Sequence, residues 1–198
     1  MTDPYRRVFD TLVAAGWKVR ERDAANALSV DTLFPAELRK RYPNVPPELV
    51  AFLGRLDECT NAEENQWFLT AADYAGTSDS AFVWNEWEKQ ELETFEDDAE
   101  ETASIREFWN NYLPFFSDVS GDYAYFAVRV TDPVPKKRGL LDRITRQPVE
   151  PTRGAVIHGI EEYRAVTSPV ATTFAEFLDQ LVTTLRNPGA NTKLSGLI

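Results

Sequence analysis

The strongest constraint on the fold of this chain is a strand-forming run over residues 123–131. Aromatic and β-branched residues dominate the run, and this composition favours a β-strand. Because successive side chains of a strand point to opposite faces, alternate residues should face opposite sides of a sheet. One side would carry Ala124, Phe126, Val128 and Val130, and the other Tyr123, Tyr125 and Arg129. The run therefore predicts a sheet whose two sides differ in character.

Clear helical patterns lie near both ends of the chain. Thr173 and Glu176 form a capping-box pattern, and a continuous apolar face follows at helical spacing. That face consists of Phe174, Phe177, Leu178, Leu181, Val182 and Leu185. Near the N-terminal end, Asp3-Pro4 is a helix-start pattern and Gly16 is a helix stop. Between them the expected buried residues are Tyr5, Phe9, Leu12 and Val13.

Weaker patterns fill the middle of the chain. Helices are expected over residues 33–42, from Pro46 through Leu56, and from Ser104 through Leu113, where Pro114 would end the helix. Short strands are expected over residues 66–70, 155–158 and 164–167. Residues 132–153 hold four prolines and should form a long excursion between strands, and residues 187–198 should be a flexible tail.

These patterns together predict one fold class. We expect an α+β protein with a single domain over residues 1–198. A mainly antiparallel or mixed β-sheet would carry helices packed on it, including one N-terminal and one C-terminal helix.

Charge is distributed unevenly along the chain. Residues 57–122 contain 18 acidic residues and only two basic ones, Lys89 and Arg106, whereas the whole chain has a net charge of −11. A block this acidic repels phosphate backbones, which disfavours nucleic-acid binding. It would attract a basic protein partner by long-range steering. The alternative is a solvated acidic surface that only aids solubility.

Cysteine usage and hydropathy bear on the compartment. The only cysteine, Cys59, cannot form an internal disulfide. No apolar run typical of a signal peptide follows Met1, and no stretch approaches the roughly 20 apolar residues that a membrane span needs. The sequence therefore predicts a cytoplasmic protein that has no contact with a membrane.

The chain offers few residues for catalysis. One cysteine and one histidine are too few for a typical zinc site. His158 lies in a strand-like run, where a hydrogen-bonded structural histidine is the better interpretation. Gly154 and Gly159 have the spacing of a phosphate-binding loop but lack the Lys-Ser/Thr that should follow. We therefore expect a protein that is not an enzyme and that has no cofactor and no metal.

Six residues are candidates for contact with a partner. They are Trp84, Glu86, Trp87, Glu91, Asp118 and Asp122. Trp84 and Trp87 are three residues apart and could share one helix face, where large aromatics are typical binding anchors. The alternative for at least one of them is core packing.

The acidic candidates also have two interpretations. Glu86 and Glu91 would line an acidic helix face, although such residues commonly just meet solvent. Asp118 and Asp122 flank a turn and could hold a cation or act in acid–base chemistry. Aspartate is also what a tight turn prefers.

Three segments, in order, resemble the SUKH superfamily, which includes the fungal cell-wall synthesis regulator and many bacterial toxin-immunity proteins. The first is the run Pro-Pro-Glu-Leu-Val-Ala-Phe-Leu at residues 46–53. The second runs from Trp109 through Leu113-Pro114-Phe115-Phe116 into the turn Ser120-Gly121-Asp122-Tyr123. The third combines residues 154–157 with residues 170–178. The resemblance covers roughly residues 30–186.

The resemblance implies a protein without catalytic residues or a cofactor. Bacterial members of the superfamily are thought to neutralise toxins by direct binding, so the first hypothesis is an immunity-type protein whose partner is a basic toxin domain. A regulatory scaffold that binds endogenous proteins is the second hypothesis. An enzyme with a carboxylate-only site at Asp118 and Asp122 is a remote third. The oligomeric state stays open.

Overall fold

The computed structural model describes residues 3–80, 82–121, 123–133, 150–160, 169–195 and 198. These residues form a six-stranded antiparallel sheet in which each strand lies beside its neighbour in sequence. The strands are β1 (Lys18–Glu21), β2 (Leu56–Thr60), β3 (Gln66–Phe68), β4 (Tyr112–Asp118), β5 (Ala124–Arg129) and β6 (Val156–Ile160). The predicted α+β class is confirmed, and the sheet is antiparallel and not mixed.

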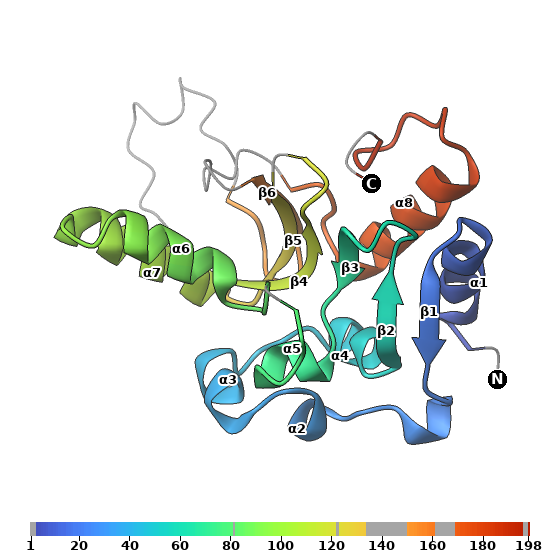
Figure 1. The fold of residues 1–198 in the computed structure, drawn as a ribbon, viewed down its shortest axis with the longest axis horizontal. Coiled ribbons are helices and arrows are strands. Elements are labelled where there is room, and N and C mark those ends of the chain that lie inside the picture. Colours follow the sequence, from blue (N-terminus) through green and yellow to red (C-terminus); the bar gives the residue numbers. More distant parts are fainter. Residues whose placement is uncertain (1–2, 81, 122, 134–149, 161–168, 196–197) are drawn as a thin grey trace.

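Helices surround this sheet (Figure 1). They are α1 (Arg6–Ala14), the 3₁₀ turn η1 (Ala24–Asn26), α2 (Val30–Leu33), α3 (Ala36–Arg41), α4 (Pro47–Leu53), α5 (Ala71–Ala75), α6 (Glu86–Thr94), α7 (Ala99–Asn111) and α8 (Phe174–Arg186). Helices α1 and α8 pack side by side. Helices α6 and α7 form a pair that extends away from the rest of the molecule, at the left of the figure.

The alternation predicted for residues 123–131 separates two hydrophobic cores. Phe126 and Val128 belong to the larger core, on the face covered by α1, α4 and α8. Tyr125 and Ala127 belong to a smaller core on the opposite face, under α6 and α7. All four side chains are at most 1% exposed. Strand β5 is therefore buried on both faces, which is what the run of apolar residues without polar interruption requires.

Helix α8 covers the larger core as its pattern predicts. Phe174 packs 5.6 Å from Phe52, and Phe177 packs 5.1 Å from Phe126, both measured between ring centroids. Its N-terminus is capped by Thr173, whose side chain accepts a hydrogen bond from the backbone N–H of Glu176. The carboxylate of Glu176 in turn accepts the backbone N–H of Thr172. The fold thus satisfies N–H groups that a helix start leaves without partners.

Helix α1 differs from its prediction at one position. Phe9 and Leu12 are buried as expected, but Val13 is 55% exposed. Gly16 follows the helix with a φ of +89°, a conformation that favours glycine, and this confirms the predicted stop.

The predicted helix from Ser104 through Leu113 is wrong at both ends. Helix α7 begins earlier, because Asp98 caps it by accepting the N–H groups of Glu100 and Glu101. The helix ends at Asn111, and Tyr112 already belongs to β4. Pro114 lies inside that strand, where the pairing with β5 shifts register. A bulge is where an interior strand tolerates a proline, because the missing N–H removes one hydrogen bond of the ladder.

Two other helix predictions also need correction. The expected helix over residues 33–42 is interrupted at Pro35, which separates α2 from α3. Proline disfavours the helical conformation of the residue before it, and Phe34 is accordingly extended. Leu56 does not continue α4 but starts β2. The predictions for residues 164–167, and most of the excursion over residues 132–153, lie outside the described residues.

The segment that follows α8 has more contacts than its lack of pattern suggests. Leu194 is fully buried against the larger core. Lys193 donates from its backbone N–H to the side chain of Gln180 and from Nζ to the carbonyl of Pro169. The part of the tail up to residue 195 is therefore packed against the domain.

A glycine in β6 makes the smaller core possible, and this can be tested. A Cβ atom at Gly159 would lie 2.2 Å from Cζ of Tyr125. Gly159→Ala is therefore expected to lower the free energy of unfolding by about 1–3 kcal/mol, measured by urea denaturation. Gly121→Ala is the control, because a Cβ there would meet no atom within 4 Å. Equal small effects of the two substitutions would contradict this packing.

Candidate protein-binding surface

Helices α6 and α7 and the turn between them, residues 86–111, form what we call the acidic arm. The arm contains ten acidic residues and only two basic ones. Its two helices pack against each other, and one end of the pair lies on the sheet. At that end Trp87, Ile105 and Trp109 join Tyr125 and Ile157 in the smaller core. The arm is thus a charged projection with an apolar base.

Aromatic contacts and one hydrogen bond fix the base of the arm. The ring centroids of Trp87 and Trp109 lie 5.4 and 5.0 Å from that of Tyr125. The indole N–H of Trp109 donates to the carboxylate of Glu91 over 2.9 Å, which ties α7 to α6. Aromatic pairs in this range add stability beyond the area that they bury. The base is therefore a rigid support for the charged part.

Arg41 of α3 connects both helices of the arm to the rest of the domain. Its guanidinium donates two hydrogen bonds to the carboxylate of Glu88, at 2.6 and 2.8 Å. Its Nε donates to the side chain of Asn110 in α7 over 2.9 Å. Only 11% of the Glu88 side chain is exposed, so the paired geometry offsets its desolvation. This contact fixes the direction in which the arm projects.

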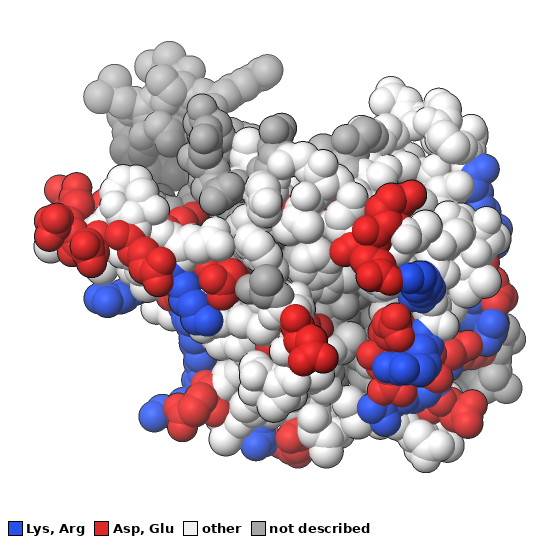
Figure 2. Space-filling model, in the orientation of Figure 1, with Lys and Arg blue, Asp and Glu red and all other residues white. Residues whose placement is uncertain are grey.

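The far end of the arm is different, because four of its carboxylates have no ion-pair partner among the described residues. Phe95 lies there and is 41% exposed. The four exposed carboxylates around it are Glu93, Glu96, Asp97 and Glu100. Figure 2 shows acidic side chains gathered at this end of the molecule, at its left edge. Here an apolar ring is surrounded by unneutralised negative charge.

The two tryptophans proposed as partner contacts lie in different environments. Trp84 precedes α6, so the two do not share a helix face as expected. Trp84 is half-buried, packs edge-on to Tyr42 at 6.2 Å and lies under the guanidinium of Arg41. Trp87 is only 2% exposed and belongs to the smaller core. Trp87 therefore has a packing role, and only Trp84 reaches the surface.

The predicted carboxylates are also separated. Glu86 pairs with Lys89 over 3.3 Å, and Glu91 is held by Trp109 at the base of the arm. Asp118 accepts hydrogen bonds from Ser120 within its own turn and from the side chain of Gln66. These hydrogen bonds fit the turn interpretation of Asp118, while Asp122 lies outside the described residues.

The sequence pattern missed the most exposed part of the arm. Phe95 was not among the six candidate residues, and it lies directly after α6, at the turn between the two helices. The density of acidic residues over 93–101 was the available signal, and only the structure shows that an aromatic ring lies among them.

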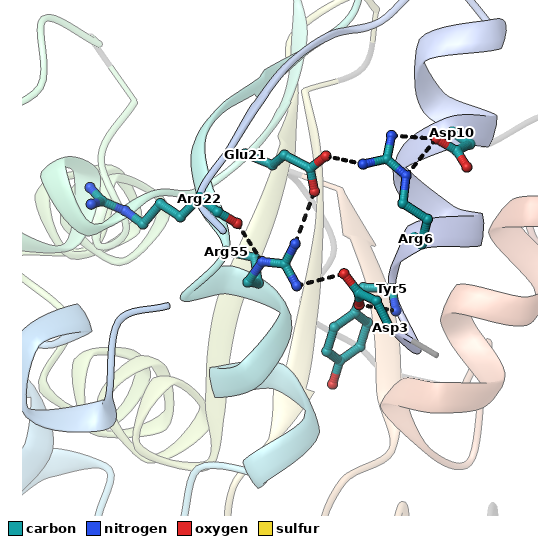
Figure 3. A network of polar contacts seen from close by, with 7 residues as sticks. All are labelled: Asp3, Tyr5, Arg6, Asp10, Glu21, Arg22 and Arg55. Carbon is teal, nitrogen blue, oxygen red and sulfur yellow. Dashed lines mark hydrogen bonds and ion pairs between the residues drawn. The ribbon is translucent and has the colours of Figure 1, made fainter. Parts of the chain in front are cut away.

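A second polar arrangement lies at the other side of the molecule, around Arg55 (Figure 3). Its guanidinium donates to Asp3 at 2.8 Å, to Glu21 at 3.1 Å and to the carbonyl of Arg22 at 2.5 Å. The side chain of Arg55 is only 8% exposed. These bonds fasten the start of the chain to β1 and to the end of α4.

The residues most often used in catalysis lie in packed surroundings. Burial lowers the pKa of His158, whose ring packs on Phe126 at 5.2 Å. Burial raises the pKa of the Cys59 thiol well above its usual value. Among the described residues, His, Cys, Asp and Glu side chains form no group of three that would suit a metal ion. None of the described helices is long and apolar enough to cross a membrane.

No protein-family model matches the chain, and no curated protein matches it.

The hydroxyl of Tyr125 gives a test of the base of the arm. It is buried and has no hydrogen-bond partner among the described residues. Because an unsatisfied buried hydroxyl is costly, Tyr125→Phe should raise the free energy of unfolding by about 1 kcal/mol. Tyr74→Phe is the matched control, since the hydroxyl of Tyr74 donates to the carbonyl of Pro114 over 2.8 Å, and its loss should cost about 1 kcal/mol. If both variants lost stability equally in urea denaturation, the hydroxyl of Tyr125 would have a partner.

Asp3 gives a test of the Arg55 contacts through pH. Burial opposes its ionisation, but the hydrogen bonds from Arg55 and from the backbone N–H of Tyr5 outweigh burial, so folding lowers the pKa of Asp3. A lowered pKa stabilises the fold above the unfolded value of roughly 4, and this contribution is lost as pH falls through the folded value. Asp3→Asn should therefore destabilise the protein at neutral pH, and this difference in stability should shrink as pH falls below roughly 4.

Urea denaturation across that pH range measures the effect. Asp23→Asn is the control, because Asp23 is exposed and has no ion pair among the described residues. A difference between wild type and Asp3→Asn that stayed constant with pH would contradict the assignment.

Proposed function

We propose that this protein is a non-catalytic protein-binding module of the immunity type, which neutralises a basic toxin domain by binding it through the acidic arm. The observation that carries the proposal is the end of the arm, where exposed Phe95 lies among four carboxylates that have no ion-pair partner in the part of the chain that the structure describes. Elsewhere many surface carboxylates are paired, as Asp57 is with Arg22 and Asp31 with Arg39.

Three physical properties suit the arm to this role. Free carboxylates on a projecting element attract a basic surface and accelerate encounter. An exposed aromatic ring can fill an apolar pocket of the partner and exclude water from the charge pairs around it. The base, held by Trp87, Trp109 and Arg41, leaves little conformational freedom to be lost on binding.

The sequence resemblance to the SUKH superfamily supports the same class of function. Bacterial members of that superfamily are thought to neutralise toxins, many of which are basic nucleases. An endogenous partner, bound by a regulatory scaffold, is the alternative that the experiment must separate.

The test compares two variants of equal charge. The arm variant replaces Glu93, Glu96 and Glu100 by glutamine and Asp97 by asparagine. Glu91 and Asp98 stay unchanged, because they accept structural hydrogen bonds. The control variant makes the same change at Asp23, Glu37, Glu63 and Asp79, which are exposed and lie off the arm. Both variants gain four units of charge, so only the position differs.

Each protein is used as bait in a lysate of its own organism, and binding of the recovered partner is then timed at low and moderate salt. We expect the arm variant to associate about tenfold more slowly at low salt and the control variant to behave as wild type. Phe95→Ala should weaken binding without changing charge. Equal association rates for all variants would overturn the role of the arm.

The identity of the partner separates the two classes of function. A single basic partner whose expression arrests growth, and whose toxicity this protein relieves, is the result expected for an immunity protein. Capture of several endogenous proteins without such toxicity would favour the scaffold.

A further inference from the structure

An apolar groove lies away from the acidic arm, between the start of α1, the segment over residues 24–30 and α4. Its volume is about 740 Å³. Among its lining residues are Tyr5, Leu28, Val30, Val45 and Ala51. Val30 is 41% exposed. A hollow of this size with an apolar lining has the dimensions of a small-molecule site.

Two of the described lining residues are charged, and they are bonded to each other. They are Asp3 and Arg55. Arg55 is neutralised by Asp3 and Glu21, which it bonds at 2.8 and 3.1 Å. Figure 3 shows Asp3 and Tyr5 lying beside this guanidinium. The carboxylate of Asp3 keeps free acceptor positions, because it accepts two hydrogen bonds and has about four lone-pair sites.

Among the described residues, the groups around the charged end of the groove are net negative, because four carboxylates (Asp3, Asp10, Glu21 and Glu48) outnumber two guanidinium groups (Arg6 and Arg55). Arg6 is also shared between two carboxylates, those of Glu21 and Asp10. The hydroxyl of Tyr5 donates to the carbonyl of Glu48. Burial, and after it the charges of Glu48 and Asp3, raise the pKa of Tyr5, so both carboxylates act on this end of the groove. A cation is therefore favoured there, and an anion is repelled.

We propose that the groove binds a lipophilic amine, with its apolar chain along the lining of Leu28, Val30 and Ala51 and its ammonium group at Asp3. The amine donates to the free positions of the carboxylate, and the chain removes exposed apolar surface from water. No lining residue belongs to the acidic arm, so this site is independent of the proposed function.

Four probes separate the contributions of the chain and of the charge. Octylammonium, octanol and octanoate share an eight-carbon chain and differ in the charge of the head group, and ethylammonium carries the charge without the chain. Isothermal titration calorimetry with the full-length protein at neutral pH should show that octylammonium binds about tenfold more tightly than octanoate. Octanol should lie between them, and ethylammonium should not bind detectably.

Two tryptophan substitutions locate the site. Ala51→Trp fills the groove and should abolish octylammonium binding, whereas Ala103→Trp changes an exposed alanine of α7 and should not. Asp3→Asn should abolish the preference for the cation over octanol. Urea denaturation of each variant verifies that it is folded under the conditions of the titration.

Several results would overturn the proposal. Absence of octylammonium binding to the wild-type protein would do so, as would equal binding of the three eight-carbon probes. Binding that survives Ala51→Trp, or that is lost equally in Ala103→Trp, would place the amine elsewhere. An unchanged cation preference in folded Asp3→Asn would remove Asp3 from the site.

Discussion

Strand β5 has no solvent-facing side over most of its length, and this constraint determines how the rest of the chain must cover it. Phe126 and Val128 need helices on one face, and α4 and α8 supply them. Tyr125 and Ala127 need cover on the other face, and the base of the acidic arm supplies it. A buried aromatic side chain contributes roughly 2–3 kcal/mol relative to an exposed one, so neither face can be left open. The arm can extend into solvent because its base is part of a core.

Local patterns predicted the parts of the fold whose side chains are apolar and regularly spaced. The helix over residues 174–186 and the strand over residues 124–129 belong to this group. Strand β4 escaped prediction because Pro114, as a sequence signal, marks the end of a helix. In the structure Pro114 lies inside the strand, at a register shift where an interior strand can hold a proline. Strand β1 escaped prediction because three of its four residues, Lys18, Arg20 and Glu21, are charged. Its identity as a strand depends on pairing with β2, nearly 40 residues away.

The negative charge of the candidate surface was predictable from the sequence, but the side chains that form the surface were not. The acidic block over residues 57–122 pointed to the arm, whereas the shared helix face expected for Trp84 and Trp87 did not form. Those two side chains belong to different cores because the helix begins between them, and helical spacing alone cannot reveal a helix start that lacks a capping side chain. The groove near Asp3 gave no sequence signal at all. Its lining comes from three segments that only the fold brings together.

The position of α8 has a consequence for synthesis of the protein on the ribosome. The helix follows every strand in sequence, yet Phe174 and Phe177 complete the aromatic cluster formed by Phe52, Phe115 and Phe126. A nascent chain that has already paired its strands still exposes these rings until α8 leaves the exit tunnel. Folding of the larger core can therefore be completed only after α8 has left the exit tunnel. During that interval the growing chain presents an uncovered aromatic sheet face, the type of surface that chaperones recognise.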